Sequence, residues 1–237
     1  GCTFPSIPNV PDHPDLRTGA VYGTGKREEN LRGYFAAISA MDEQIGRLLD
    51  AVEEQGLADN TVILFTADNG MSMGQHGVWG KGNGTFPMNM YDSAVKVPFL
   101  ISWPGHIPAN TVCSEMISAC DLLPTILKLT GLSDKQPTGL PGRSFTELLE
   151  GRQLEHRDEV VIFDEYGPVR MIRTKEWKYV HRYPYGKHEL YYLVDDPGEE
   201  KNLYGLPEYK KLVTQLKGRM EKWFCTYSDP AIDGVRS

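Results

Sequence analysis

The sequence has few cysteines, no excess of basic residues and no long apolar run, and each shortage excludes a class of protein. Its four cysteines among 237 residues are too few for a disulfide scaffold and lack the spacing of zinc or redox sites. The 25 Lys and Arg against 32 Asp and Glu give a net charge of −7, so a nucleic-acid partner is not expected. No run approaches the roughly twenty apolar residues of a membrane-spanning helix. Residues 1–11 carry no visible secretion signal. The cellular location stays open, with a periplasmic or extracellular place favoured over the cytoplasm.

The composition that is present indicates a folded globular chain. Hydrophobic residues make up 40% and charged residues 24% of the sequence, which excludes disorder, collagen and coiled coil. Residues 1–30 are rich in proline and read as an extended surface segment. Apolar residues then recur every three or four positions over residues 31–52 and predict a helix, with Asn30 as its N-cap and Gly56 as its stop.

Two apolar runs predict strands buried on both faces, TVILFTAD (residues 61–68) and VPFLISWPG (residues 97–105). The residues between them have no period and are expected to form a long functional loop. ISACDLLPTILKLTGL predicts a helix with Pro124 in its first turn and Gly131 at its end, and FTELLEG predicts a shorter one. We therefore expect an α/β domain over residues 1–151.

After Gly151 the pattern changes to short strand-like runs. EVVIFDEY, VRMIRTKEWKYVHRY and HELYYLVDD are separated by turn residues and alternate in polarity, with Val169 and Met171 set against Arg170. This predicts an antiparallel sheet of three or four strands. PEYKKLVTQLKGRMEKWF carries one apolar face and predicts a closing helix. Residues 152–237 are thus expected to form an α+β subdomain.

The first candidate site follows the first predicted strand. Asp68, Asn69 and Gly70 lie at its carboxyl end, where α/β sheets bind ligands. A carboxylate and an amide offer oxygens that suit a hard divalent cation, and glycine lets the chain turn away. The alternative is an ordinary Asp-Asn-Gly turn that ends the strand.

Two further residues of the loop could act on an anion. Lys81 is a point charge able to hold a tetrahedral oxyanion, and His76 could donate a proton to a leaving oxygen. Both are flanked by glycines that let a ligand approach the backbone. The alternatives are a surface histidine and a solvated lysine.

The order of five segments resembles the type I sulfatases of the alkaline phosphatase superfamily. They are TVILFTADNG, QHGVWGKG, MYDSAVKVPFLISWPG, DLLPTILKLTG, and MIRTKEWKYV with ELYYLVDDPGEEKNL. The resemblance implies part of a sulfatase-like mixed sheet flanked by helices, followed by a small antiparallel sheet packed with a helix. It implies that Asp68 and Asn69 bind calcium, or alternatively magnesium. Lys81 corresponds to the lysine that contacts sulfate, and His76 to a loop histidine near the substrate in some members.

The sequence departs from the family pattern in several places. The formylglycine nucleophile arises in a Cys/Ser-x-Pro/Ala-x-Arg motif far upstream of the Asp-Asn-Gly, and Cys2 is rejected because its proline is one place late and no arginine follows. His13 lies in DHPDL, whose context we assign to the linker. Tyr91-Asp92 stands where many members have Tyr-Glu. We expect this chain to be the C-terminal part of a sulfatase that is inactive without its N-terminal part and an upstream formylglycine.

By that resemblance the substrate is a sulfated glycan or small molecule, with carbohydrate sulfates expected first. The loop of residues 82–90 is the expected specificity element. The alternatives are a phosphodiesterase or phosphonate hydrolase of the same superfamily, and a non-catalytic binding module with this fold. The upstream sequence would separate the module from the enzyme, because only the enzyme needs the nucleophile motif.

Overall fold

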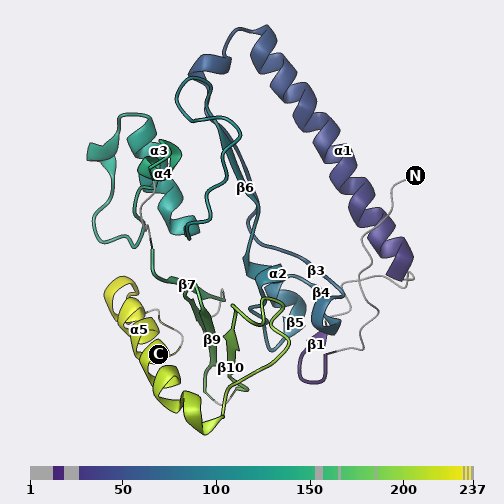
Figure 1. The fold of residues 1–237 in the computed structure, drawn as a ribbon, viewed down its shortest axis with the longest axis vertical. Coiled ribbons are helices and arrows are strands. Elements are labelled where there is room, and N and C mark those ends of the chain that lie inside the picture. The colour runs from purple at the N-terminus through teal and green to yellow at the C-terminus, as the bar shows by residue number, and fades with distance from the viewer. Residues whose placement is uncertain are drawn as a thin grey trace. The chain divides into compact units, whose positions relative to one another are not determined.

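The computed structural model divides into two compact units, Gly1–Ala109 and Asn110–Ser237, which are coloured from purple to teal and from teal to yellow in Figure 1. The domain boundary expected after residue 151 stays a prediction. Cys2 lies outside the described residues. The structure describes residues 13–18, 27–152, 157–164, 167–184, 186–231, 233 and 235.

Unit 1 contains the long helix α1, Arg27–Glu54. It begins before the predicted start, so Asn30 lies inside the helix and its assignment as N-cap was wrong; Glu28 and Glu29 in the first turn suit the positive end of the helix dipole. Its end was predicted correctly. Gly56 has a φ of 66°, and Leu57 N donates to Val52 O at 3.1 Å, as expected of a glycine stop.

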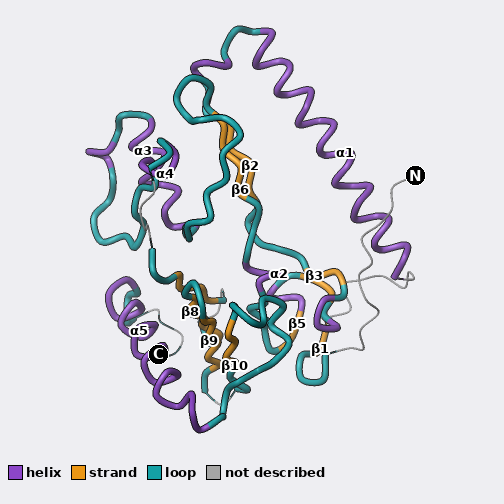
Figure 2. Tube along the Cα trace, in the orientation of Figure 1, coloured by secondary structure: helices purple, strands orange, loops and turns teal. Residues whose placement is uncertain are grey.

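The two predicted strands pair with each other. β2, Ile63–Thr66, runs antiparallel to β6, Phe99–Ser102, and Figure 2 shows them side by side. The expectation that both are buried on both faces was wrong, because every residue of β2 is only half-buried and Leu100 of β6 is 63% exposed. Antiparallel strands present alternate side chains to two faces, and the half-buried and exposed residues of β6 alternate in this way.

The loop between β2 and β6 is built from short elements rather than irregular chain. Strands β3 and β4 form a hairpin, β5 pairs with β1, and the short helix α2 precedes β6. The remaining short elements of unit 1 are 3-10 turns. Their bounds are β1 Arg17–Thr18, η1 Ala58–Asn60, β3 Ser72–Met73, η2 Gln75–Gly77, β4 Trp79–Gly80, η3 Gly82–Gly84, β5 Thr85–Phe86 and α2 Asp92–Val95.

Unit 2 begins with the helices that were predicted. The turn η4, Ala119–Asp121, leads into α3, Leu122–Leu129, and is followed by η5, Ser133–Lys135, and α4, Thr146–Leu149. Asp121 is fully buried and bonded by both Arg157 and the main-chain N–H groups of Ser118 and Arg143. Burial alone would raise the pKa of Asp121, but these hydrogen bonds outweigh it and hold that pKa below its usual value.

The predicted antiparallel sheet is present with four strands in the order β10-β9-β8-β7. Polarity alternates along β8 but exposure does not, because Val169 to Ile172 are all buried. Arg170 is buried since its guanidinium pairs with Asp233 and lies 3.7 Å from the ring centroid of Phe224. The strand bounds are β7 Val160–Phe163, β8 Val169–Arg173, β9 Trp177–Arg182 and β10 Glu189–Tyr192.

The closing helix α5, Lys210–Tyr227, follows the turn η6, Pro207–Tyr209. Its buried residues Leu216, Met220 and Phe224 recur every four positions, as one face of a helix requires. They pack with strand residues such as Ile172 and Leu190 into the core of unit 2. Among the described helices, none is both long and apolar enough to cross a membrane.

Candidate functional site

The turn after β2 places two oxygen-bearing side chains at the end of that strand. Asp68 is exposed, and its Oδ1 accepts a hydrogen bond of 2.8 Å from Asn69 N. The side-chain nitrogen of Asn69 donates to Gly70 O at 2.9 Å, so the amide oxygen is the atom of this side chain that could bind a cation. The turn therefore presents a carboxylate and an amide oxygen from adjacent residues.

This turn is fixed against the start of α2. Gly70 N donates to Ala94 O at 2.8 Å, and the hydroxyls of Ser72 and Ser93 lie 2.7 Å apart. The approach is so close that only glycine fits at position 70, since a Cβ there would lie 2.2 Å from Ser93 O. Glycine is thus required at this position by a close approach of two main chains.

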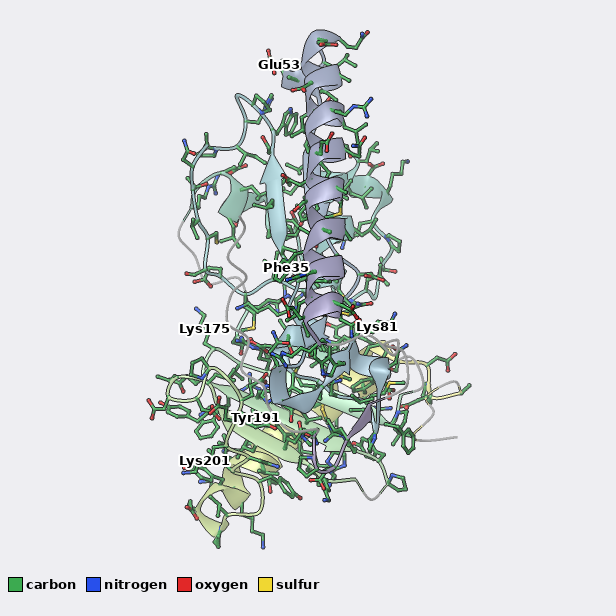
Figure 3. The ribbon with its side chains drawn as sticks, turned by 90° about the vertical axis from the view of Figure 1, so that its right-hand side faces the viewer. Phe35, Glu53, Lys81, Lys175, Tyr191 and Lys201 are labelled. Atoms are coloured by element: carbon green, nitrogen blue, oxygen red, sulfur yellow. The ribbon has the colours of Figure 1, made fainter. Side chains whose placement is uncertain are left out.

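The β3–β4 hairpin brings Lys81 back toward the same turn. Ser72 pairs with Gly80 and Met73 with Trp79, so Lys81 follows the strand end that lies beside the start of β3. Its side chain is exposed and is labelled in Figure 3. The hairpin thus brings together the chain segments of Lys81 and the Asp68-Asn69 pair, although they are separated by ten residues or more in the sequence.

His76 lies at the other end of the hairpin, within its tip. It adopts a left-handed conformation with a φ of 56°, which is uncommon for a residue with a side chain. Its ring is half-buried and stacks on Tyr91, with ring centroids 3.7 Å apart and an interplanar angle of 4°. His76 is therefore held by a residue that precedes α2.

His13 also contacts Tyr91, which the sequence analysis missed. Its Nε2 lies 3.0 Å from the Tyr91 hydroxyl. We assigned His13 to a linker and noted of Tyr91 only that Tyr91-Asp92 stands where many sulfatases have Tyr-Glu. No local pattern could have joined them, because 78 residues separate the two positions.

The loop of residues 82–90 is closed largely on itself. Asn89 is fully buried, and its side-chain nitrogen donates to Lys81 O at 3.3 Å and to Thr85 Oγ1 at 3.1 Å. Thr85 in turn donates to Pro87 O at 2.8 Å. In contrast to the buried Asn89 and Thr85, the side chain of Phe86 is 78% exposed. The loop is therefore held by its own hydrogen bonds and exposes the ring of Phe86.

Asp68 and Asn69 fit part of a metal site. In the described part of the chain, no three side chains of His, Cys, Asp or Glu lie close enough to hold a metal ion. Calcium takes six to eight oxygen ligands, and these two residues offer two or three. Their oxygens are of the kind that a hard cation takes, and the described residues supply no complete set of ligands around them.

Comparison with known proteins decides the family. Residues 6–132 match the family described as sulfatase, and residues 74–225 match the family described as N-sulphoglucosamine sulphohydrolase, C-terminal. The chain belongs to the sulfatase family. Among curated sulfatases, it is 31% identical over 219 residues to an N-acetylglucosamine-6-O-sulfatase of Bacteroides thetaiotaomicron, covering 86% of this chain and 37% of that protein.

Solved structures agree with the sulfatase fold. The chain superposes with a TM-score of 0.76 and 30% identity on a protein in complex with its substrate D-glucosamine-2-N,6-O-disulfate, covering 87% of this chain and 42% of the other. A phosphonate monoester hydrolase of Agrobacterium radiobacter gives a TM-score of 0.70 at 27% identity, covering 83% and 42%. The chain spans between 34% and 45% of the length of eight curated relatives that it matches.

Proposed function

We propose that this chain is the C-terminal part of a sulfatase that hydrolyses sulfate esters of carbohydrates. The observation that carries the proposal is the 30% identity and TM-score of 0.76 to a protein whose structure contains a sulfated glucosamine as substrate. The match to an N-acetylglucosamine-6-O-sulfatase supports the same substrate class. Catalysis would need an N-terminal part of the same protein, which carries the formylglycine nucleophile.

Different residues of unit 1 would have different roles in the hydrolysis of the sulfate ester. Lys81 would neutralise charge on the sulfate oxygens as the ester bond breaks. His76 would orient the leaving alcohol or donate a proton to its oxygen. Asp68 and Asn69 would hold calcium, or magnesium, which when bound supplies positive charge to the sulfate and the nucleophile. The other ligands would come from the N-terminal part.

The exposed apolar side chains on one face of α1 support the proposal that a further part of the protein packs there. Across the described helix only Leu31 is buried, and Figure 3 shows its side chains projecting between Phe35 and Glu53. Its apolar stripe includes Ile38, Met41 and Leu48, which are 38%, 45% and 67% exposed. Covering their exposed parts is favourable, since full burial of a fully exposed side chain of this kind gains about 1.5–3 kcal/mol. We propose that the N-terminal part covers this stripe.

Phe86 is the proposed contact for the leaving group. Its ring is exposed while Thr85 and Asn89 beside it are buried, so the loop holds the ring without covering it. Aromatic rings stack on the apolar faces of sugars. The loop of residues 82–90 would therefore contribute to the choice of carbohydrate sulfate.

A phosphonate or phosphodiester hydrolase is the second candidate, because a phosphonate monoester hydrolase shares the fold at 27% identity. Sulfate and phosphonate monoesters are both tetrahedral anions, so the same lysine could serve either. Asn69 after the aspartate favours the sulfatase.

The test is an assay of the purified full-length protein on matched esters. Glucosamine 6-sulfate and nitrophenyl sulfate represent sulfate esters, and bis-nitrophenyl phosphate and a phenyl phosphonate ester represent the second candidate. We expect kcat/KM to be highest for the sulfates. Preference for the phosphorus esters would reject the sulfatase. Mass spectrometry of the active polypeptide checks the second half of the proposal, since a mass of 26.6 kDa would contradict the need for an N-terminal part.

A further inference from the structure

Three residues from distant segments form one line of contacts in unit 1. His13 contacts the Tyr91 hydroxyl through its Nε2 at 3.0 Å, and the ring of Tyr91 stacks on His76. Tyr91 is 4% exposed and lies directly before α2. One buried ring therefore connects the segment at residue 13, the start of α2 and the hairpin tip.

The hydrogen bonds of His13 determine its tautomer. Its Nδ1 accepts from Asp15 N at 3.0 Å and from Leu16 N at 2.9 Å, so that nitrogen carries a lone pair and no proton. In the neutral ring the proton then lies on Nε2, which donates to the Tyr91 hydroxyl oxygen. His13 thus fixes the position of the Tyr91 ring through a directed hydrogen bond.

The stack in turn restrains His76. A left-handed residue other than glycine is strained and persists only where its surroundings support it. Two main-chain hydrogen bonds of the turn hold the backbone on either side of His76. Gly77 N donates to Gly74 O at 3.1 Å, and Val78 N donates to Gln75 O at 2.9 Å. The parallel ring of Tyr91 holds the plane of the imidazole, because tilting that plane would break the 3.7 Å stack.

We propose that Tyr91 is a positioning residue that sets the direction of the His76 imidazole toward the leaving oxygen, and that His13 holds Tyr91 in place for this purpose. The inference rests on the proposed function, in which His76 acts on the leaving alcohol. By this proposal, His13 contributes to the site by positioning Tyr91.

The test separates leaving groups that need a proton from those that do not. A carbohydrate alkoxide is a poor leaving group and depends on proton donation, whereas nitrophenolate is stable as an anion. In the full-length protein, Tyr91→Leu removes the stack. Misplacing a catalytic group by about 1 Å costs on the order of a hundredfold, so kcat/KM for glucosamine 6-sulfate should fall about 10- to 100-fold. The value for nitrophenyl sulfate should change less than about threefold, because the proton contributes little there.

A second stacked pair in unit 1 provides the matched control. Trp103 and His106 lie with ring centroids 3.8 Å apart and an interplanar angle of 13°. Trp103→Leu removes the aromatic ring that stacks on His106, a histidine outside the proposed site. It should leave the ratio of the two kcat/KM values unchanged. His76→Ala should reproduce the selective loss, and the double variant His76→Ala with Tyr91→Leu should lose no more than His76→Ala.

Two milder variants keep the test decisive if Tyr91→Leu does not fold. Tyr91→Phe keeps the ring and loses the hydroxyl, and His13→Ala loses the partner of that hydroxyl. A selective loss on the carbohydrate sulfate in both supports the inference. Equal losses on both sulfates, or none, overturn it. If the unsubstituted protein hydrolyses neither sulfate, the proposed function itself fails.

Discussion

The main chains of Gly70 and Ser93 approach so closely that a Cβ on Gly70 would lie 2.2 Å from Ser93 O. Gly70→Ala must therefore push the Asp68-Asn69 turn away from α2. We expect a loss of about 1–3 kcal/mol in the free energy of unfolding of the full-length protein, as for other overpacked sites. Urea denaturation measures it.

Gly46 is the matched control for this substitution. It lies within α1, and a Cβ there meets nothing within 4 Å. Gly46→Ala should raise stability by about 0.5–1 kcal/mol, because alanine favours a helix. A Gly70→Ala protein as stable as the unsubstituted one would show that the turn can move without cost.

Lys81→Ala should lower kcat of the full-length enzyme about 100- to 1000-fold, the usual effect of losing one contact that stabilises transition-state charge. Its side chain is exposed, so the melting temperature should stay the same. Lys128→Ala removes another exposed lysine from α3 and should leave kcat unchanged. An unaltered kcat in Lys81→Ala would remove this lysine from the site.

Leu48→Asp tests whether the N-terminal part covers the apolar stripe of α1. A carboxylate placed in an apolar interface lacks hydrogen-bond partners. The full-length protein should lose about 2–4 kcal/mol of stability. Glu43 lies on the opposite face of the helix by its spacing, so Glu43→Lys should change stability by less than about 0.5 kcal/mol. Equal, small effects of both would mean that the stripe faces water.

Asp121→Ala should destabilise unit 2, because it leaves the Arg157 guanidinium buried without its carboxylate. Breaking such a buried pair costs about 3–5 kcal/mol. Asp134, whose pair with Lys135 is about two-thirds exposed on both sides, is the control. Asp134→Ala should cost less than about 1 kcal/mol. Thermal unfolding of the two variants compares them directly, and similar melting temperatures would contradict a structural role for the buried pair.

We expect His181 to make the protein less stable in acid. It is 7% exposed, bonded to the Tyr179 hydroxyl at 2.6 Å and stacked on His188 with ring centroids 4.0 Å apart. Burial, followed by the nearby charges of His188, Lys217 and Arg170, lowers the pKa of His181 to about 3. The unfolded histidine titrates near about 6.5, so its contribution to stability is complete above that pH and is lost as the pH falls toward 3.

The measurement is urea unfolding at several pH values between 7 and 4. Between about 6.5 and 3 the unfolded chain binds one more proton at this position, which predicts a slope of about 1.4 kcal/mol per pH unit. His181→Gln should remove its share of that slope and leave the share of His188, whose pKa burial also lowers. His106→Gln, at an exposed histidine, should leave it as it was. A slope that is unchanged in His181→Gln would assign the acid sensitivity to other groups.

Local patterns in the sequence determined most of the elements and the family. The period of apolar residues predicted α1, and Gly56 predicted its end, because both depend on near neighbours along one helix. The antiparallel sheet and closing helix of unit 2 followed from short polar-apolar runs and turn residues. The order of the segments around Asp68 and Lys81 indicated a sulfatase, which the comparisons confirmed.

Contacts between distant residues were decided only by the tertiary structure. The pairing of His13 with Tyr91 joins positions 78 residues apart, and the Arg157 bond to Asp121 joins positions 36 apart. Neither has a local sequence signal, since each depends on where the intervening chain packs. The same reason explains the exposed Leu100: an apolar run shows that a strand can be buried, whereas only the neighbouring elements decide which face is covered.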